Sequence, residues 1–334
     1  MIKTILVTGG AGYVGAVLIP KLLKNNYTVK VLDWYLYDPH VFDSFKKDRK
    51  IIEIKGDIRN KKLVQKSLKG TDAVIHLACV SNDPSFELNP HFGKSVNYDA
   101  TIQLINLARE ARVKRFIYAS TSSVYGVKKE KEVTEDLILE PLTDYSKYKA
   151  LCEPYLISKG SDSFTVFIIR PATICGYSPR MRLDLTVNML TIQSLVNKKI
   201  TVFGGSQKRP NIHIEDMTDL YINSLSYPKA KIHKKIYNAG YENYTVREIA
   251  EMVKKITNDE KVKIVYLPSN DLRSYHISAK KIAKELGFKP KHSVEEAIRD
   301  IKKAYIKGLI PRPFSNPNYW NVKKMKEMFK DNEQ

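Results

Sequence analysis

The stretch TGGAGYVG, Thr8–Gly15, decides the fold, because its closely spaced glycines join a short apolar run to a helical pattern. These glycines fit two templates. Gly10, Gly12 and Gly15 make G-x-G-x-x-G, whereas Gly9, Gly12 and Gly15 make G-x-x-G-x-x-G. Both templates place a diphosphate at a helix N-terminus, where backbone N–H groups and the helix dipole favour negative charge. The stretch therefore predicts a dinucleotide-binding loop.

The chain around this loop alternates short β-branched runs with helical patterns. Strands are expected at 4–8, 28–33, 51–58, 72–79, 115–121 and 164–171, and helices at 15–26, 61–70, 98–112 and 145–159. Strands that alternate with helices of this length form βαβ units, in which a parallel sheet is covered on both faces. The predicted fold class is α/β, a Rossmann-type doubly wound parallel sheet.

The second half of the chain has a different pattern, which indicates a smaller, interwoven C-terminal lobe. We expect the nucleotide-binding domain to cover residues 1–170. A helix at 213–228 and a strand at 235–240 predict that residues 209–240 return to it. Residues 171–208 and 241–334 are assigned to the second lobe, and residues 200–211 are expected to form a loop.

The composition favours a soluble cytoplasmic protein. Three cysteines without C-x-x-C spacing argue against a disulfide framework and a zinc site, and we expect no metal. The N-terminus lacks a long apolar segment, and no apolar run is long enough to span a membrane. The formal net charge is +20, but the lysines are spread in pairs along predicted helices, and no nucleic-acid-binding motif accompanies them. We therefore expect neither nucleic acid nor membrane as a partner.

Asp33 ends the strand that follows the glycine-rich loop. A carboxylate at this place binds the adenosine ribose hydroxyls of a dinucleotide and repels a 2′-phosphate. No arginine follows in DWYLYDP, so the sequence favours NAD over NADP. An ordinary aspartate at a strand end is the alternative.

Tyr145 and Lys149 form Y-x-x-x-K on a predicted helix, so both side chains share one face. A lysine cation beside a phenol lowers the phenol's pKa and makes it a usable general base. The pattern occurs five times in this tyrosine- and lysine-rich chain. Only Tyr145 begins a long helix that follows a hydroxyl-rich strand end, ASTSSVYG, where ligands bind in such sheets.

The sequence resembles the extended short-chain dehydrogenase/reductase family, specifically its nucleotide-sugar epimerases and dehydratases. The resemblance is carried by the motifs TGGAGYVG, GDI, HLAC, STSSVYG and YSKYK, and it extends over nearly the whole chain to about residue 305. The resemblance implies that Tyr145 removes a proton from a sugar hydroxyl while the hydride passes to the nicotinamide. It implies that Thr121 hydrogen-bonds the same oxygen and that Lys149 holds the nicotinamide ribose. These three residues select the template that uses Gly9.

The same resemblance implies the remaining site residues and a homodimer that pairs through helices at 97–112 and 144–159. The implied NAD contacts are Gly9, Gly12, Tyr13, Val14, Gly15, Asp33, Asp57, Ile58, Leu77, Ala78, Asn97, Tyr145 and Lys149. The implied contacts with a nucleotide-diphosphate sugar are Ser81, Thr121, Tyr145, Asn188, Phe203, Arg209 and Arg273. Arg180 and Arg182 fit either a substrate contact or a solvated loop.

Departures from the family pattern narrow the reaction. Ser122 and Ser123 stand where 4,6-dehydratases carry Asp-Glu, and a hydroxyl cannot supply their acid–base chemistry. Ser81 replaces a lysine of galactose-type 4-epimerases, which bears on the sugar rather than on the redox step. We expect an NAD-dependent 4-epimerase. The alternatives are a 4-dehydrogenase that releases the keto sugar and a non-enzymatic binding protein on the same fold. The segment after residue 310 fits a cover for the substrate lobe, a subunit contact or a frayed terminus.

Overall fold

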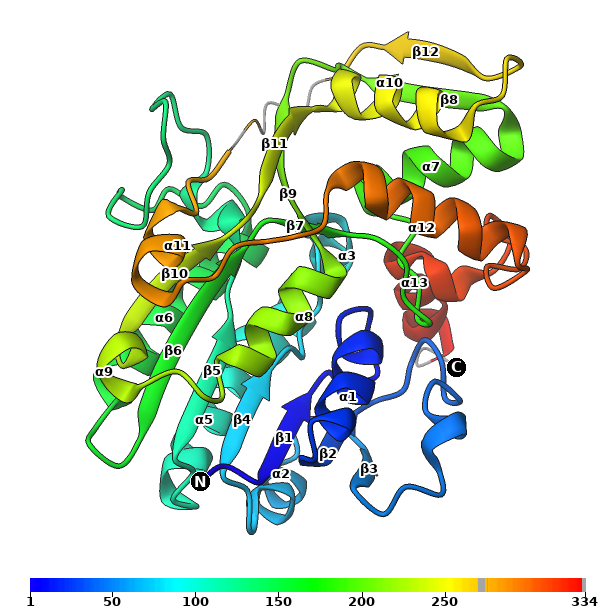
Figure 1. The fold of residues 1–334 in the computed structure, drawn as a ribbon. Helices are drawn as coiled ribbons and strands as arrows, with labels where there is room; N and C mark the ends of the chain where they lie inside the picture. The colour runs from blue at the N-terminus through cyan, green and yellow to red at the C-terminus, as the bar shows by residue number, and fades with distance from the viewer. Residues whose placement is uncertain (270–273, 275, 332–334) are drawn as a thin grey trace.

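A seven-stranded, all-parallel sheet forms the centre of the molecule. The computed structural model describes residues 1–269, 274 and 276–331. The strand order is β10-β6-β5-β4-β1-β2-β3, and Figure 1 shows this sheet below a second group of elements. The doubly wound fold is therefore confirmed. The strands are Thr4–Thr8 (β1), Thr28–Asp33 (β2), Ile51–Lys55 (β3), Ala73–His76 (β4), Arg115–Ala119 (β5), Thr165–Pro171 (β6) and Lys235–Ala239 (β10).

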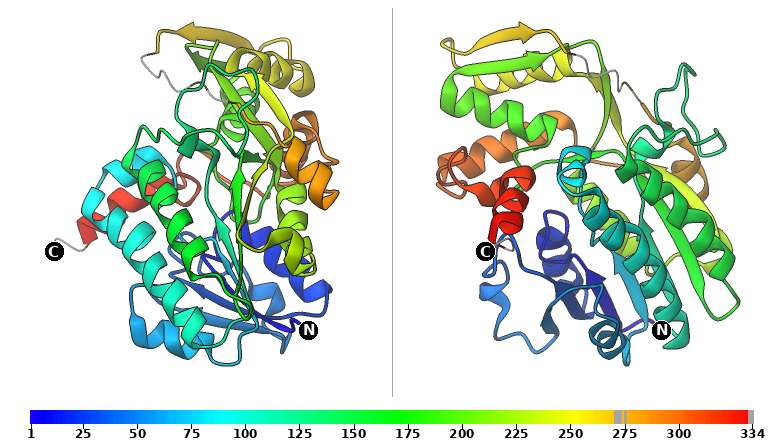
Figure 2. Two further views of the ribbon diagram at one scale, coloured as in Figure 1. Left: turned by 90° about the vertical axis from the view of Figure 1, so that its left-hand side faces the viewer. Right: turned by 180° about the vertical axis from the view of Figure 1, so that it is seen from behind.

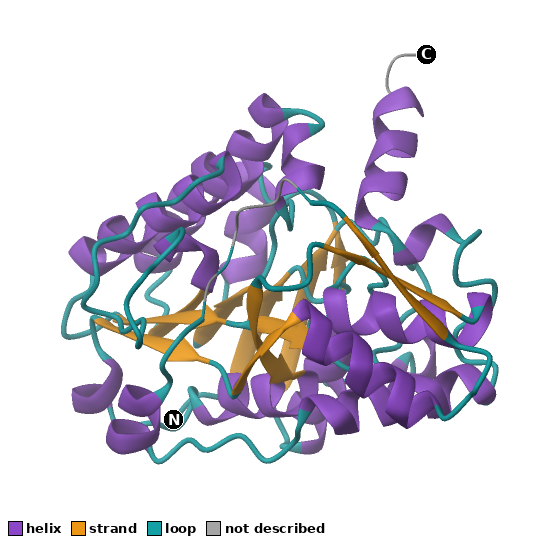
Figure 3. Cartoon of the chain, turned by 90° about the horizontal axis from the view of Figure 1, so that it is seen from above, coloured by secondary structure: helices purple, strands orange, loops and turns teal. Residues whose placement is uncertain are grey.

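Helices cover both faces of the sheet, as Figure 3 shows from above. One face carries Gly15–Lys24 (α1), Ile214–Asn223 (α8), Lys229–Ile232 (α9) and Lys280–Leu286 (α11). The opposite face, seen from behind in Figure 2, carries Lys61–Leu68 (α2), Ala100–Glu110 (α5) and Asp144–Lys159 (α6). Two apolar clusters fill the spaces between sheet and helices, so the nearly continuous apolar runs of the strands are buried on both sides.

After β9 (Lys208–His213) the chain runs beside the central sheet again. α8 packs beside α1, and β10 pairs in parallel with β6 at the edge of the sheet. The predicted helix at 213–228 corresponds to α8, and the strand at 235–240 corresponds to β10. No helix among the described residues is both long and apolar enough to cross a membrane.

The second group of elements has two small sheets and three helices. Its strands are Thr173–Cys175 (β7), Lys199–Phe203 (β8), Lys208–His213 (β9), Glu242–Thr245 (β11) and Lys263–Leu267 (β12). Strand β9 lies between β11 and β7, and β8 pairs with β12. Its helices, Thr186–Asn197 (α7), Val246–Thr257 (α10) and Val294–Ile306 (α12), pack against one another around an apolar core.

The expectation of a loop over residues 200–211 is wrong. Only residues 204–207 turn, where Gly204 and Gly205 have φ values of 72° and 116° that favour glycine. The flanking residues are strands because β8 and β9 find partners in β12 and β11, far along the chain. Tertiary pairing overrides the local composition here.

The C-terminal segment folds back onto the molecule. A short 3₁₀ turn, Pro317–Tyr319, leads into the helix Asn321–Asp331 (α13), which packs beside the short helix Asp83–Glu87 (α3). Met325 of α13 is buried in the same apolar cluster as α5 and α6. Figure 1 shows α13 in red next to the N-terminal half of the chain. Within the described residues, this segment is an ordered part of the fold.

Candidate active site

A pocket of about 370 Å³ opens at the carboxyl ends of the parallel strands. It is the place where ligands bind in open α/β sheets. Most of the residues that the sequence assigns to cofactor and catalysis line it together, and so does Ser81, which it assigns to the substrate. They are Gly9, Gly12, Tyr13, Val14, Asp33, Asp57, Ile58, Leu77, Ala78, Ser81, Thr121, Tyr145 and Lys149.

The glycine-rich loop needs glycine at the positions of one template. Gly9 has a φ of 72°, and a Cβ there would lie 2.5 Å from the backbone nitrogen of Ala78. A Cβ on Gly15 would lie 2.0 Å from the carbonyl oxygen of Gly10. A Cβ on Gly10 would meet only apolar side chains. Gly15 belongs to both templates, so the positive φ and the backbone contact of Gly9 are what favour the Gly9-Gly12-Gly15 template.

Asp33 joins the end of β2 to the glycine-rich loop. Its carboxylate accepts hydrogen bonds from the N–H of Ala11 (2.9 Å) and of Tyr35 (2.8 Å). Burial raises the pKa of this carboxyl group above its usual value, and the backbone donors oppose the shift. The carboxylate is therefore fixed beside the glycine-rich loop.

Asn97 supports the pocket from below. It lies on a π-helical turn, Ser95–Asp99, and is buried. Its side chain accepts from the N–H of Val80 (2.8 Å) and donates to the carbonyl of Val80 (2.9 Å). This pair of hydrogen bonds fixes the segment after β4, which contains Leu77, Ala78 and Ser81. Neither Asn97 nor Gly15 lines the pocket, and both shape residues that do.

The three catalytic candidates meet at the ends of β5 and α6. Thr121 begins a 3₁₀ turn, where its hydroxyl accepts from the N–H of Ser123 (3.1 Å). Tyr145 lies in the first turn of α6, and Lys149 follows one turn later on the same face. Buried Lys149 donates from Nζ to the carbonyl of Ala119 at 2.8 Å. The hydroxyls and the ammonium thus share one wall of the pocket.

A buried polar network lies behind this wall. Arg170 of β6 makes two hydrogen bonds to Glu153 of α6, at 3.0 and 2.6 Å. The hydroxyl of Ser120, next to Thr121, donates to the same carboxylate at 2.5 Å. Arg170 also donates to the hydroxyl of Tyr125 at 2.8 Å. The network connects α6 to the ends of β5 and β6, and so fixes the distance between Thr121 and Tyr145.

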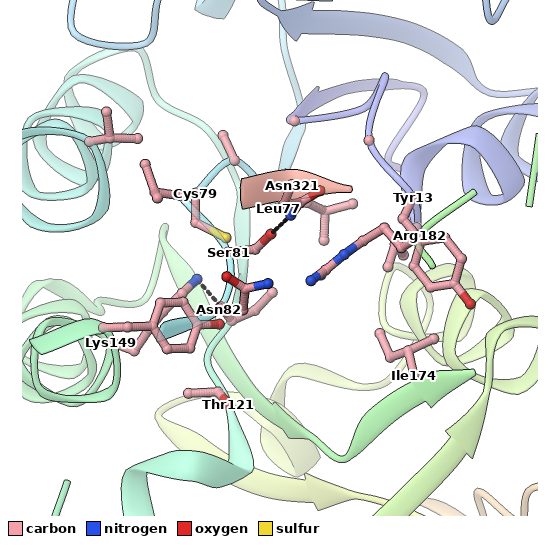
Figure 4. A pocket seen from close by; sticks show the side chains of 18 of the residues that line it. Tyr13, Leu77, Cys79, Ser81, Asn82, Thr121, Lys149, Ile174, Arg182 and Asn321 are labelled. Atoms are coloured by element: carbon pink, nitrogen blue, oxygen red, sulfur yellow. Dashed lines mark hydrogen bonds between the residues drawn. The ribbon is translucent and has the colours of Figure 1, made fainter. Parts of the chain in front are cut away.

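The loop between β7 and α7 crosses the top of the pocket. Arg180 and Arg182 both lie in it and both line the pocket, so neither is a solvated loop residue. Arg182 makes two hydrogen bonds of 3.0 Å to Asp184, which also accepts from Asn82 at 2.7 Å. In Figure 4, Arg182 and Tyr13 lie across the pocket from Thr121 and Lys149.

Three described residues assigned to the substrate, Asn188, Phe203 and Arg209, do not line the pocket. Asn188 is fully buried and donates to the hydroxyl of Tyr13 (3.2 Å), so it supports the glycine-rich loop. Phe203 is 52% exposed at the end of β8, and Arg209 lies on β9; neither lines the pocket. Arg273 lies outside the described residues. The substrate roles of these four residues stay predictions.

The structure adds pocket residues that the sequence analysis did not assign. Asn82 has a φ of 77°, and its side chain both caps α3 and reaches Asp184. From α13 come Asn321 and Met325. Asn321 donates to the hydroxyl of Ser81 at 2.8 Å, as Figure 4 shows. An asparagine with positive φ is uncommon, but nothing local in the sequence marks Asn82 or the distant α13 as part of the site.

Comparisons with known proteins agree with this geometry. A model of the NAD dependent epimerase/dehydratase family matches residues 5–240. The UDP-glucose 4-epimerase of Lactobacillus helveticus is 29% identical, covering 88% of this chain and 94% of its own. The human dTDP-D-glucose 4,6-dehydratase is also 29% identical, covering 98% and 95%.

A solved structure carries the same fold together with its ligands. The UDP-glucuronic acid 4-epimerase from Bacillus cereus, in complex with UDP-glucuronic acid and NAD, superposes with a TM-score of 0.81. It is 29% identical, covering 92% of this chain and 99% of its own. Epimerases and dehydratases thus both resemble this chain at similar identity. The chain belongs to the NAD dependent epimerase/dehydratase family and is an NAD-dependent enzyme.

Proposed function

We propose that the protein is a nucleotide-sugar 4-epimerase. It would oxidise the C4 hydroxyl of the sugar to a transient ketone and return the hydride to the opposite face. The observation that carries the proposal is the composition of one pocket wall. Thr121, Tyr145 and Lys149 lie together there, and the two residues after Thr121 are serines.

The residues present fit NAD. Gly9 lets the glycine-rich loop pack against the backbone of Ala78, which shapes the loop for a diphosphate, and Asp33 would present a fixed carboxylate to the adenosine ribose. A 2′-phosphate would meet that carboxylate, whose like charge disfavours NADP. When bound, NAD supplies the acceptor and donor of the hydride. We assign adenine contacts to Asp57 and Ile58, which line the same pocket.

Proton transfer falls to the chain's own side chains. In the proposal, Tyr145 removes the proton of the reacting hydroxyl and later returns it. The hydroxyl of Thr121 donates a hydrogen bond to the same oxygen. Lys149, buried and one helical turn away, favours the ionised phenol by its positive charge. Its hydrogen bond to Ala119 holds the ammonium in place for this role.

The supply of carboxylates argues against dehydration. Elimination of water needs an acid at the leaving hydroxyl and a base at C5, and Ser122 and Ser123 provide neither. The carboxylates that line the described pocket are those of Asp33, Asp57 and Asp83. Asp33 binds the glycine-rich loop, Asp57 pairs with Arg59, and Asp83 accepts from Thr143 at 2.6 Å. None of them follows Thr121 in the chain.

The substrate class rests on the relatives. Their names include UDP-glucose and dTDP-glucose, and one solved neighbour contains UDP-glucuronic acid. We infer a nucleoside-diphosphate sugar as substrate, with its sugar between Tyr145 and Arg182.

We also propose a homodimer that pairs through α5 and α6. The side chain of Leu151 on α6 is 44% exposed, and such a contact would cover it.

The test is incubation with a panel of UDP-, GDP-, CDP- and dTDP-sugars in D₂O, followed by NMR of the sugar ring and absorbance of NADH. An epimerase forms the C4 epimer without net NADH and without deuterium on carbon, because the hydride never exchanges with solvent. Deuterium at C5 would show dehydration, and NADH equal to the product would show a 4-dehydrogenase. Either result would replace the proposal. Tyr145→Phe serves as the inactive control.

A further inference from the structure

Arg180 is a buried cation with unused hydrogen-bonding capacity. Its side chain is 3% exposed, and its guanidinium carbon lies 3.6 Å from the centre of the Tyr37 ring. Nη2 donates to Oδ1 of Asn321 at 2.6 Å. Nε and Nη1 are buried and have no hydrogen-bond partner among the described residues. Burial lowers the pKa of Arg180 to about 10. Such a group calls for an anionic partner.

The surroundings of Arg180 place it on the cofactor side of the pocket. The hydroxyl of Ser178 donates to the carbonyl of Tyr13 at 2.7 Å, so the arginine-bearing loop is held against the glycine-rich loop. Arg180 interacts electrostatically with Asp33, at the end of β2. Arg182, two residues later, hydrogen-bonds Asp184 and interacts electrostatically with Tyr145. Arg180, by contrast, hydrogen-bonds Asn321 and interacts electrostatically with Asp33.

Helix α13 lies on the same side of the pocket as Arg180. Asn321 donates to Ser81 and accepts from Arg180, so one side chain ties the helix to both walls of the pocket. Met325 lines the pocket and is buried in the apolar cluster that contains Ile58. Phe329 packs edge-on against Phe92, with ring centres 5.4 Å apart. These contacts lie beside Ile58, which the proposed function assigns to the adenine of NAD.

We propose that Arg180 binds the diphosphate of NAD, that Asn321 positions its guanidinium, and that α13 encloses the cofactor. A guanidinium presents planar N–H donors, and Nε and Nη1 of Arg180 both remain available to donate to phosphate oxygens. The glycine-rich loop offers backbone N–H groups to the same anion. Because Arg180 is buried, the pairing is screened little by solvent and slows NAD release.

The experiment measures cofactor binding and needs no turnover, so its outcome is independent of the proposed reaction. Wild type, Arg180→Met and Asn321→Ala are purified, and the NAD released on denaturation is quantified per chain. ADP-ribose and adenosine are then titrated into NAD-free protein. Arg299→Met, on an exposed ion pair of α12, is the matched control. Methionine at position 180 keeps the apolar contact with Tyr37 but removes the charge.

We expect Arg180→Met to bind ADP-ribose at least about tenfold more weakly and to retain less NAD, with adenosine affinity unchanged. Asn321→Ala should release NAD faster than wild type, and Arg299→Met should match wild type. Wild-type NAD content and ADP-ribose affinity in Arg180→Met would overturn the proposal. A simultaneous loss of nucleotide-sugar affinity would assign the guanidinium to the substrate instead. If Arg180→Met does not fold, an unchanged rate of NAD release in Asn321→Ala overturns it.

Discussion

Single residues in this pocket combine a structural and a chemical task. Asp33 fixes the glycine-rich loop through Ala11, and in the proposed function its carboxylate also binds the adenosine ribose. Lys149 donates one hydrogen bond to the carbonyl of Ala119, and in the proposed function its charge also favours the ionised phenol of Tyr145. Because each side chain is already held in position, binding of cofactor and substrate needs little rearrangement of these groups.

Asp33→Ala should weaken NAD binding more than NADP binding. The substitution removes both the acceptor for the ribose hydroxyls and the charge that repels a 2′-phosphate. Fluorescence titration with both dinucleotides measures the ratio of their dissociation constants. Asp33→Asn, which keeps the shape but not the charge, separates the two causes. An unchanged NAD-to-NADP ratio in both variants would contradict the assignment of Asp33.

Tyr145→Phe should lower turnover by about 10²–10⁴-fold while NAD remains bound, because only the proton-transferring hydroxyl is removed. Single-turnover rates and NAD content measure the two effects separately. Tyr155→Phe is the matched control, since Tyr155 lies on the same helix and its hydroxyl bonds Asn106 instead. Near-wild-type turnover in Tyr145→Phe would remove this residue from the mechanism.

At the scale of elements, α6 carries two of the catalytic candidates and is anchored to the central sheet. It begins with a capping box at Thr143 and carries Tyr145 and Lys149 toward the pocket. One turn beyond Lys149, Glu153 makes the buried ion pair with Arg170 of β6. A helix anchored in this way places its first turn reproducibly against the end of β5.

Glu153→Ala should destabilise the fold by about 3–5 kcal/mol, because it leaves the guanidinium of Arg170 buried without its charge partner. Urea unfolding measures the change in the free energy of unfolding. Glu295→Ala, which breaks the exposed pair with Arg299, should cost less than about 1 kcal/mol. Equal effects of the two substitutions would show that the buried pair does not stabilise α6.

His76 of β4 makes stability depend on pH. It is buried between the hydroxyls of Thr8 (2.6 Å) and Thr101 (2.9 Å), and burial lowers its pKa from 6.5 to about 3. Between these two values the unfolded chain binds the additional proton, so stability falls as the pH falls below 6.5. One such group contributes a slope of about 1.4 kcal/mol per pH unit.

The measurement is urea unfolding of wild type and His76→Gln between about pH 7 and pH 5. The variant should lose less stability on acidification, because glutamine does not titrate. The other titrating groups are shared by both proteins and cancel in the difference. Parallel pH profiles would contradict a neutral, buried His76.

Much of this architecture could be predicted because its signals are local. The alternation of apolar runs and helical patterns gives the sheet, and the spacing of glycines with Asp33 gives the dinucleotide loop. The strands β8 and β9 were missed because their partners lie far along the chain. Arg180 and Asn321 are separated by 141 positions in the sequence, so no local pattern predicts their hydrogen bond. Non-local pairing is the common cause of both failures.

At the scale of the whole molecule, the C-terminal segment completes the pocket whose other walls come mainly from the first half of the chain. It leaves the second lobe after α12 and returns to the nucleotide-binding domain at Ser81. On the way, Trp320 packs on Phe314 and donates to the carbonyl of Pro313, which gives the segment a small core of its own. The cofactor half of the pocket is thus made by both ends of the chain.

Deleting residues 312–334 should therefore accelerate NAD release, so that the protein loses more of its bound NAD when it is diluted. The reason is the loss of Met325 and Asn321 from the pocket. Release is followed by trapping free NAD with an excess of a dehydrogenase that consumes it. A chain that ends at Asp331 is the control. Equal release rates in both truncated chains would show that α13 does not enclose the cofactor.

Tyr13 sets the direction from which the pocket can be entered. Its hydroxyl donates to the carbonyl of Gly176 at 2.7 Å and accepts from Asn188, while its own carbonyl accepts from Ser178. This buried tyrosine holds the second lobe against the glycine-rich loop. A hinge motion that moves the lobe away from the loop would break these hydrogen bonds. Exchange of a long dinucleotide would then require the terminal helix to lift. The rate of cofactor turnover in the cell would follow the local unfolding of some twenty residues at the end of the chain.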